Sequence, residues 1–446
     1  MSADVSLLQK CLNKVKSTVF EKGKLIYRAH IPALRRQKER IEASWSTRPD
    51  GDTIRVGFVL QVPQNWVVLG PLYEAALANE RIEPVVLLVP ELEIAHYISI
   101  KNVIWEEIYA FGEAKAPEHC VRTYDPKTGE WLDPATLSLD YAFIIRPYET
   151  YLPKQYRASG LSNYAKVCHI TYACTMTDDD WPVEYNSHFM RCVSLIFADR
   201  PASVSYLNKQ FHETISTGIQ KVYSLGFPGF DGVESHRGNE SAVWPRPRAC
   251  SDLRIIWAPR WTIDPRMGGG HFFDYKDQMI ELAERDQKVD LLFRPHPMAL
   301  GHYVSQGWIT QEEEDAYLAR YERCANASVD LTREYYDTFF SSDVLITDFS
   351  SMVYGYLFTG KPLIYCGGTL DYLMNEEGLL DCMYIASSFD DILRYLEQFR
   401  RGEDPKLPQR MEIANRLNSG DGVAPQFMQV LLDDFDEGKK AEHASR

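Results

Sequence analysis

The chain of 446 residues lacks any apolar run long enough to span a bilayer, and its start, MSADVSLLQKCLNK, lacks a long apolar core. We therefore expect no membrane-spanning helix and no signal peptide. The nine cysteines form no CxxC pair and no framework of the secreted type. Such cysteine usage predicts reduced thiols in a cytoplasmic protein. Internal repeats and low-complexity tracts are also absent, so the length predicts two ordinary globular domains.

The chain also has no excess of basic residues, and its formal net charge of −15 argues against nucleic-acid binding. Residues 1–48 are the exception, with eleven Lys and Arg against four Asp and Glu. Within this segment Leu8, Leu12, Val15 and Val19 recur at helical spacing among lysines. The pattern predicts a basic amphipathic helix that could lie on an anionic membrane surface. Alternatively, the helix packs on its own domain or on a second subunit.

Apolar strand-like segments alternate with helix-like segments along the rest of the chain. The predicted strands are 54–60, 84–89, 139–145, 166–171, 195–198, 221–225, 253–258, 290–293, 344–347 and 363–365. Predicted helices at 73–78, 275–284, 311–324 and 390–400 lie between or beyond these strands. This alternation predicts an α/β fold with parallel sheets.

The predicted division has four parts. They are a basic helical segment (1–48), an N-terminal Rossmann-like domain (49–225), a C-terminal Rossmann-like domain (226–422), and a C-terminal helix and tail (423–446). The stretch 226–248 is rich in Gly, Pro and Arg, which is typical of a hinge. We therefore expect two Rossmann-like domains with a cleft between them.

The stretch 342–366 is the most informative one in the sequence. It predicts a buried strand, a turn containing Asp348, Ser350 and Ser351, and a helix over 352–358. Backbone N–H groups and hydroxyls would then lie together, an arrangement suited to phosphate. Ordinary capping of the helix explains the same residues equally well.

Charged and polar residues also follow the other strands of the second half, where ligands of such sheets bind. Strand 253–258 is followed by Arg260 and a loop with Gly269 and Gly270, and strand 290–293 is followed by Arg294 and His296. Arginine binds phosphate oxygens and histidine can transfer a proton to or from them. The glycines could form only a loop and Arg260 could be a surface residue. His296 lies between two prolines, which fix where its side chain points.

Several of these segments resemble the CDP-glycerol glycerophosphotransferase family of teichoic-acid and capsule polymer synthesis. The resembling segments are WAPRWTID (257–264), FRPHP (293–297) and SDVLITDFSS (342–351), with GFPGFD (226–231) at the turn between the halves. Upstream, VGFVLQVPQNWVVLGPLYEAA (56–76) and RPYETYLP (146–153) resemble a subgroup of the same family. The resemblance extends from about residue 54 to 422.

This resemblance implies the two-domain GT-B fold, an acceptor domain followed by a donor domain, and a CDP-linked polyol phosphate donor. It also implies that Arg294, His296, Thr347, Ser350 and Ser351 hold the donor pyrophosphate. From their place after the strands, Arg260, Gly269, Gly270 and Asp348 are further donor-binding candidates, and His296 is the catalytic candidate. The family's second histidine has no clear counterpart in VCHITYACT (167–175). His169 would be the base if the strand end is shifted, and is otherwise a core or edge histidine. Tyr172 and Asp178 are the other acceptor-side candidates.

The function that follows is a cell-envelope transferase, which moves glycerol phosphate or another polyol phosphate to a glycan or lipid-linked acceptor and releases CMP. A nucleotide-sugar glycosyltransferase and a non-catalytic subunit of a polymer-assembly complex remain alternatives. We expect no cofactor and no metal site, because no paired carboxylates accompany the cationic groups; Mg²⁺ could assist in solution without being needed for donor binding. We expect no nucleic-acid partner. The expected location is cytoplasmic and could be peripheral to the inner membrane face. The sequence is compatible with a homo-oligomer.

Overall fold

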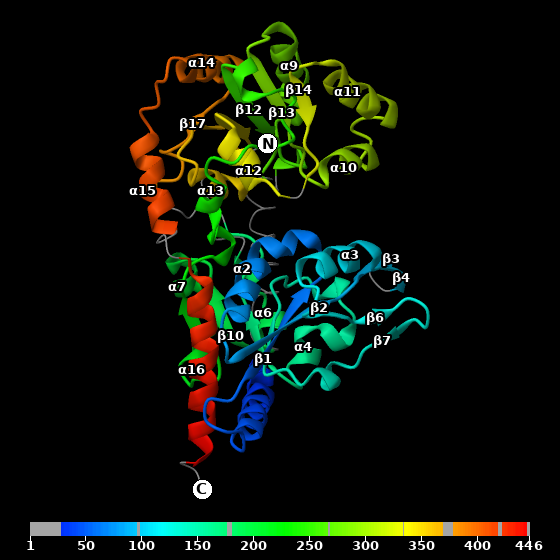
Figure 1. Ribbon diagram of the computed structural model, residues 1–446, viewed down its shortest axis with the longest axis vertical. Helices are drawn as coiled ribbons and strands as arrows, with labels where there is room; N and C mark the ends of the chain where they lie inside the picture. Colours follow the sequence, from blue (N-terminus) through cyan, green and yellow to red (C-terminus); the bar gives the residue numbers. More distant parts are fainter. Residues whose placement is uncertain are drawn as a thin grey trace, which may run out of the picture. The chain divides into compact units, whose positions relative to one another are not determined.

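A computed structural model describes residues 28–95, 99–175, 181–265, 268–332, 334–368, 378–417 and 422–443. The chain forms two compact units, each with its own parallel sheet (Figure 1). The first unit comprises Met1–Ala173, Asp179–Gly229 and Val423–Arg446, and the second comprises Cys174–Asp178 and Phe230–Gly422. The predicted α/β class is therefore confirmed.

The first unit contains a seven-stranded sheet in which every strand pair is parallel. Its order is β11 (Lys221–Ser224), β10 (Val193–Ala198), β9 (Lys166–His169), β8 (Tyr141–Phe143), β1 (Ile54–Leu60), β2 (Ile82–Leu88) and β5 (Cys120–Arg122). The central strands are nearly all buried, as expected of apolar runs covered on both faces.

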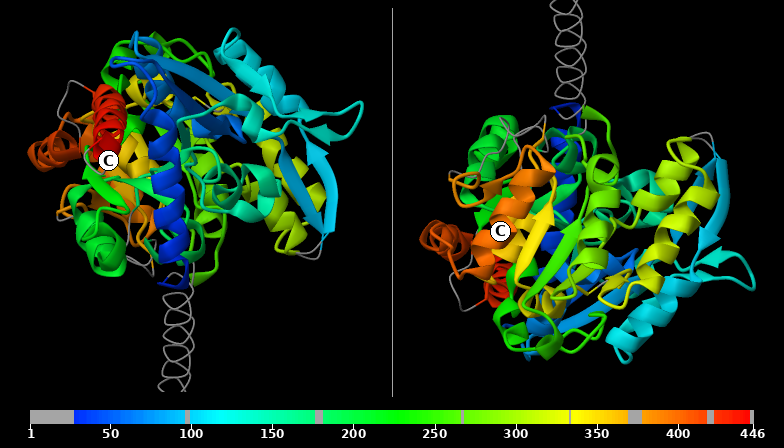
Figure 2. Two further views of the ribbon diagram at one scale, coloured as in Figure 1. Left: turned by 90° about the horizontal axis from the view of Figure 1, so that it is seen from below. Right: turned by 90° about the horizontal axis from the view of Figure 1, so that it is seen from above.

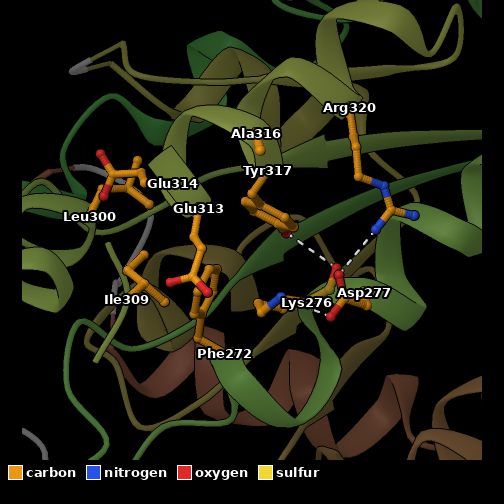
Figure 3. A pocket seen from close by; sticks show the side chains of 10 residues that line it. All are labelled: Phe272, Lys276, Asp277, Leu300, Ile309, Glu313, Glu314, Ala316, Tyr317 and Arg320. Carbon is orange, nitrogen blue, oxygen red and sulfur yellow. Dashed lines mark hydrogen bonds and ion pairs between the residues drawn. The ribbon is translucent and has the colours of Figure 1, made fainter. Parts of the chain in front are cut away.

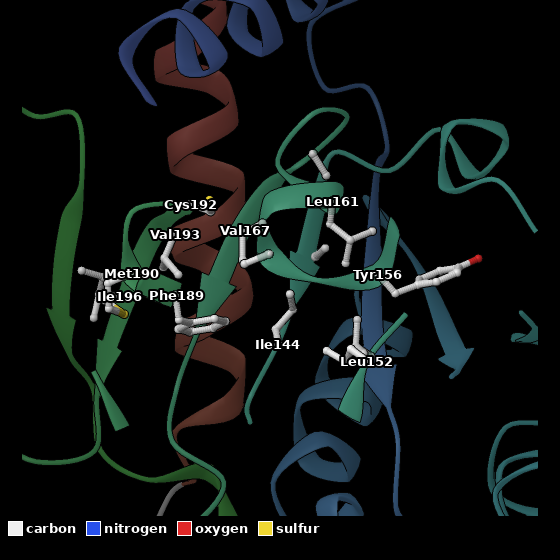
Figure 4. Close-up of a cluster of buried hydrophobic side chains, with 14 of the residues drawn as sticks. Ile144, Leu152, Tyr156, Leu161, Val167, Phe189, Met190, Cys192, Val193 and Ile196 are labelled. Carbon is white, nitrogen blue, oxygen red and sulfur yellow. The ribbon is translucent and has the colours of Figure 1, made fainter. Parts of the chain in front are cut away.

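Helices and two short hairpins complete this unit. The longer helices are α2 (Trp66–Leu77), α3 (Glu106–Lys115), α7 (Pro201–Gln210) and α16 (Ala424–His443). The short helices are α4 (Ala158–Leu161), α5 (Trp181–Glu184), α6 (Ser187–Met190) and α8 (His212–Ile215). The hairpins pair β3 (Glu91–Ala95) with β4 (Ser99–Ile104) and β6 (Tyr124–Asp125) with β7 (Glu130–Trp131). In the core, Val167 of β9, Ile196 of β10 and Phe189 of α6 are fully buried (Figure 4).

Both ends of the described chain lie against this first sheet (Figures 1 and 2). Residues 28–45 are helical, and Trp45 packs on Tyr141 of β8 and on Phe435 of α16 with ring centroids 5.5 and 5.0 Å apart. Packing on its own unit, one of the two alternatives for the basic segment, thus applies to its described part. The apolar stripe from Leu8 to Val19 lies outside the described residues.

A buried ion cluster fixes these two helices to the amino ends of the strands. Lys166, only 1% exposed, lies 2.6 Å from the carboxylate of Asp434 in α16 and 2.7 Å from that of Glu42. The hydroxyl of Tyr141 donates a hydrogen bond of 2.9 Å to Asp434. Charges buried this deeply need such partners, because an unpaired one would cost several kcal/mol.

The second unit contains a six-stranded sheet that is also parallel throughout. Its order is β14 (Ala327–Val329), β13 (Val289–Phe293), β12 (Leu253–Ala258), β15 (Val344–Thr347), β16 (Leu363–Tyr365) and β17 (Tyr384–Ile385). Its helices are α9 (Phe272–Arg285), α10 (Ala299–Ser305), α11 (Gln311–Arg323), α12 (Tyr336–Ser341), α13 (Met352–Leu357), α14 (Phe389–Arg400) and α15 (Leu407–Leu417). Among the described residues, no helix is both long and apolar enough to cross a membrane.

Candidate active site

The carboxyl ends of β13, β12 and β15, which are neighbours in the second sheet, bring three predicted residues to one edge. His296 follows β13, Arg260 follows β12 and Asp348 follows β15. Because neighbouring strands are about 4.8 Å apart, the whole group spans about 10 Å of the edge.

Asp348 is buried, with 1% of the residue exposed, and it connects the loops that follow β12 and β15 through hydrogen bonds. One carboxylate oxygen accepts hydrogen bonds from the backbone N–H groups of Arg260, at 2.8 Å, and of His271, at 3.2 Å. The other lies 2.8 Å from Nδ1 of His271. Both oxygens are therefore engaged within the protein, and the structure favours a positioning role for Asp348 over direct contact with a ligand.

His271 is the second histidine that the sequence places near this edge, directly after the glycine loop, without assigning it a role. Its ring stacks on Tyr275, one turn along α9, with centroids 5.6 Å apart, and 29% of its side chain is exposed. Nothing in the sequence indicates its pairing with a carboxylate 77 residues away. The signal that could have found it is its position directly after the glycine loop.

The glycine loop delivers His271 to this place. Gly269 has a φ of +67°, which L side chains rarely adopt. A Cβ on Gly270 would lie 2.8 Å from the carbonyl oxygen of Thr262. The shape of the loop thus requires both of the predicted donor-binding glycines. Their contact with a ligand stays a prediction.

Arg260 is held at the same edge by Phe349. Its guanidinium donates a hydrogen bond to the Phe349 carbonyl and lies over the Phe349 ring, 5.0 Å from the centroid. The carbonyl of Arg260 accepts a hydrogen bond of 2.6 Å from the hydroxyl of Tyr303. These contacts give the side chain a defined position, unlike that of an ordinary surface arginine.

Arg294 is largely buried, and its charge is already paired. Its guanidinium forms an ion pair with Asp330, donates a hydrogen bond of 2.7 Å to the carbonyl of Thr332 and lies 5.6 Å from the ring centroid of Tyr335. Asp330 directly follows β14, so this pair connects two strand ends. An anion bound here would share Arg294 with Asp330.

His296 is exposed at the turn after β13. Its Nδ1 accepts a hydrogen bond of 3.1 Å from the backbone N–H of Met298, so in the neutral ring the proton is on Nε2. Partial removal from water and the positive charge of Arg260 lower the pKa of His296 to about 4. The ring of His296 is therefore neutral at neutral pH.

The three predicted hydroxyls behave differently. Thr347 is buried and donates a hydrogen bond of 2.7 Å to the carbonyl of Ala258, so its hydroxyl connects β15 to β12. Ser350 Oγ accepts a hydrogen bond of 3.3 Å from the N–H of Met352, as in ordinary capping. Ser351 is exposed and makes no capping bond with its side chain. Ser351 is therefore the best placed of the three to bind a ligand.

In the first unit, His169 is part of the core. No part of it is exposed, its Nδ1–H donates to the carbonyl of Ile144 at 2.7 Å, and its ring packs edge-on against Phe189. Burial lowers the pKa of His169 to about 4. This placement favours the core alternative over the role of base.

Tyr172 is exposed just beyond β9, and its hydroxyl lies 3.4 Å from that of Tyr148. The Tyr148 hydroxyl in turn donates a hydrogen bond of 3.0 Å to Glu184. Burial, followed by the charge of Glu184, raises the pKa of Tyr148 well above its ordinary value. Asp178 lies outside the described residues.

A cavity of about 280 Å³ lies away from this edge. It is formed by α9, α10 and α11, and three of its charged groups pair with one another (Figure 3). Asp277 lies 2.8 Å from Lys276 and 3.0 Å from Arg320. None of the predicted site residues lines it. In the described ranges no group of three or more His, Cys, Asp and Glu could hold a metal ion.

Comparison with known proteins gives one family and a common fold. Residues 202–404 match the family described as CDP-glycerol:poly(glycerophosphate) glycerophosphotransferase, which confirms the resemblance over the second half of the chain. No curated protein sequence matches the chain.

Among solved structures, the UDP-N-acetylglucosamine 2-epimerase of Neisseria meningitidis bound to UDP-GlcNAc is 14% identical, covers 85% of this chain and 100% of its own, and has a TM-score of 0.53. A second UDP-N-acetylglucosamine 2-epimerase is 13% identical over 86% and 98%, with a TM-score of 0.52. These likenesses concern the fold alone and agree with the expected GT-B type. The wall teichoic acid polymerase TagF is 14% identical over 94% and 98%, with a TM-score of 0.48, too low to support an argument.

Proposed function

We propose that this chain, whose residues 202–404 belong to the CDP-glycerol:poly(glycerophosphate) glycerophosphotransferase family, is an enzyme that transfers glycerol phosphate from CDP-glycerol to a hydroxyl acceptor. The observation that carries the proposal is the position of the family match, because it contains the whole edge formed by β13, β12 and β15. The donors at that edge are cationic or neutral, which suits a pyrophosphate.

In the proposed reaction, an acceptor hydroxyl attacks the phosphorus that carries the glycerol, and CMP leaves. Positioning and neutralisation of charge supply most of the acceleration in such transfers. Arg260 and Arg294 would bind phosphate oxygens, Ser351 would add a hydroxyl, and His296 would donate a hydrogen bond from Nε2–H to the leaving phosphate while keeping its proton. Since both carboxylate oxygens of Asp348 are engaged within the protein, we propose that the donor binds without metal.

The acceptor and the location are the less defined parts of the proposal. Tyr148 and Tyr172 at the carboxyl edge of the first sheet are candidates for hydrogen bonds to a glycan or lipid-linked acceptor. A role on the inner face of the membrane would rest on residues 1–27, because the helical residues 28–45 pack on the first unit through Trp45.

The proposal is tested by incubating the full chain with CDP-glycerol and a lipid-linked glycan acceptor, while measuring CMP release and transfer of labelled glycerol phosphate. We expect CMP and a phosphodiester product in equal amounts. CDP-ribitol and UDP-N-acetylglucosamine serve as comparison donors in parallel reactions.

A glycosidic product from the UDP-sugar alone would instead favour the glycosyltransferase alternative. Stabilisation of the chain by CDP-glycerol without CMP release, with several acceptors, would favour the non-catalytic alternative, since a true ligand stabilises by mass action even without turnover.

A further inference from the structure

Two histidines at the edge of the second sheet are held by hydrogen bonds of opposite direction. His296 accepts a backbone N–H at its Nδ1, whereas Nδ1 of His271 faces the Asp348 carboxylate. A carboxylate accepts hydrogen bonds, so Nδ1 of His271 carries a proton and donates it. The neutral rings are therefore opposite tautomers, with the basic nitrogen at Nε2 in His271 and the proton at Nε2 in His296.

The His271 pairing is reinforced from three sides. The same carboxylate accepts the backbone N–H groups of His271 and Arg260, so the backbone that carries the ring is itself bonded to Asp348. Tyr275 stacks on the ring at an angle of 13°. Buried Asp348 is thus placed to hold one tautomer and to stabilise the ring once it is protonated, the role that a carboxylate plays beside a histidine base.

We propose that His271 is the general base of the transfer reaction and that Asp348 is its positioning residue. This inference rests on the proposed function and names the proton acceptor within it. His169, the base candidate from the sequence, has no exposed surface, whereas the side chain of His271 is 29% exposed.

The proposed step balances as follows. The acceptor hydroxyl oxygen forms a bond to the phosphorus that carries glycerol, and its proton passes to Nε2 of His271. The bond between that phosphorus and the bridging oxygen breaks, and the electron pair leaves with CMP. His271, now an imidazolium paired with Asp348, later returns its proton to water. His296 meanwhile donates a hydrogen bond from Nε2–H to the leaving phosphate and keeps its proton, so CMP leaves as the anion.

The test compares His271→Gln, His271→Ala and Asp348→Asn with the wild-type chain. CMP release, donor affinity and melting temperature are measured for each. The matched control is His236→Gln, because His236 also pairs with a carboxylate, that of Asp337, at 2.7 Å. Asp337 is in α12, which leads into the amino end of β15, at the opposite edge of the same sheet.

We expect His271→Gln and His271→Ala to lower turnover by ~10²–10⁴-fold with donor affinity within about threefold of wild type. Imidazole added to His271→Ala should restore part of the rate, which a structural role would not allow. Asp348→Asn should lower turnover less and shift the lower limb of the pH–rate profile. The other titratable groups around Asp348, which also contribute to the pH–rate profile, are Tyr275, Tyr303 and Cys366.

The inference is overturned if folded His271 variants, with wild-type melting temperature and donor affinity, turn over at the wild-type rate. It is also overturned if the losses appear only in donor affinity, or if His236→Gln causes an equal loss of turnover. Failure of the proposed function has a different signature, because wild-type chain would then release no CMP from CDP-glycerol. Should the two His271 variants not fold, the pH dependence of labelling of His271 by diethyl pyrocarbonate in wild type and in Asp348→Asn decides whether the pair controls its basicity. No change on Asp348→Asn overturns the pairing.

Discussion

The carboxyl edges of the two sheets differ in where their polar side chains go, although both sheets are parallel and built alike. At the second edge, Asp348 connects Arg260 and His271 through hydrogen bonds, and His296 projects to the surface. At the first edge, His169 turns back into the core and phenol groups remain outside. A residue's position at a strand end therefore does not make it a site residue; the direction of its side chain decides.

The strongest test of this contrast is the parallel replacement of His296 and His169. We expect His296→Ala to lower turnover by ~10²–10⁴-fold, because in the proposed reaction its Nε2–H stabilises the charge that develops on the leaving phosphate. The free energy of unfolding of His296→Ala should differ little from that of the wild-type chain, since the ring is exposed. CMP release and urea unfolding measure the two effects. An unchanged rate in His296→Ala would remove it from the mechanism and break the comparison.

His169 should instead govern stability against acid. Its pKa is about 4 in the folded chain and about 6.5 when unfolded, so the unfolded state binds the extra proton between these values. The contribution of the neutral His169 ring to the free energy of unfolding is therefore fully present above pH 6.5. It falls by about 3 kcal/mol as the pH drops toward 4. Urea unfolding from pH 7 to 4.5 should show a shallower pH slope in His169→Gln. An equal slope would mean that the ring titrates normally.

A smaller effect separates two hydroxyls of the same edge. Thr347→Val removes the hydrogen bond to the Ala258 carbonyl and should lower stability by about 1–3 kcal/mol without changing CDP-glycerol affinity. Ser351→Ala should do the reverse, with a loss of affinity of about 1 kcal/mol. Calorimetric titration and thermal unfolding of both variants measure the difference. If Ser351→Ala lowers only stability, capping explains the serine.

The smallest expected effect is that of chelation. We expect the affinity of the chain for CDP-glycerol to be the same with and without EDTA, because arginine, histidine and hydroxyl groups neutralise the pyrophosphate. Isothermal titration in metal-free buffer measures this directly. Loss of binding on chelation would mean that the Asp348 carboxylate coordinates a cation instead of pairing with His271. In that case Asp348→Asn should abolish the binding of the cation.

The sequence predicted most of the strands that matter for the site, but not their order in the sheet. Buried runs such as 253–258 and 344–347 are long and apolar, so the strands β12 and β15 could be recognised, as could the turn at Asp348. Strands β5, β14 and β17 have three residues or fewer and carry too little periodicity to be found.

Contacts between distant residues were not predictable. The pairing of His271 with Asp348 and of Arg294 with Asp330 depends on which strands are neighbours and on how each loop returns, information that is not local in sequence. For the same reason the hydrogen bond from the Thr347 hydroxyl to β12 was not predictable, and its contact with a ligand stays a prediction.

The return of α16 to the first unit has a consequence for synthesis of the chain. Residues Phe230–Gly422 form an insertion within the first unit, so the ribosome completes the second unit before it releases the last part of the first. Until Asp434 emerges, Lys166 is without one of its two carboxylate partners. Since domains generally fold as units as they emerge, the later unit should mature first, and the earlier one should wait for the final helix. A truncation after Gly422 would therefore harm the unit that was synthesised first.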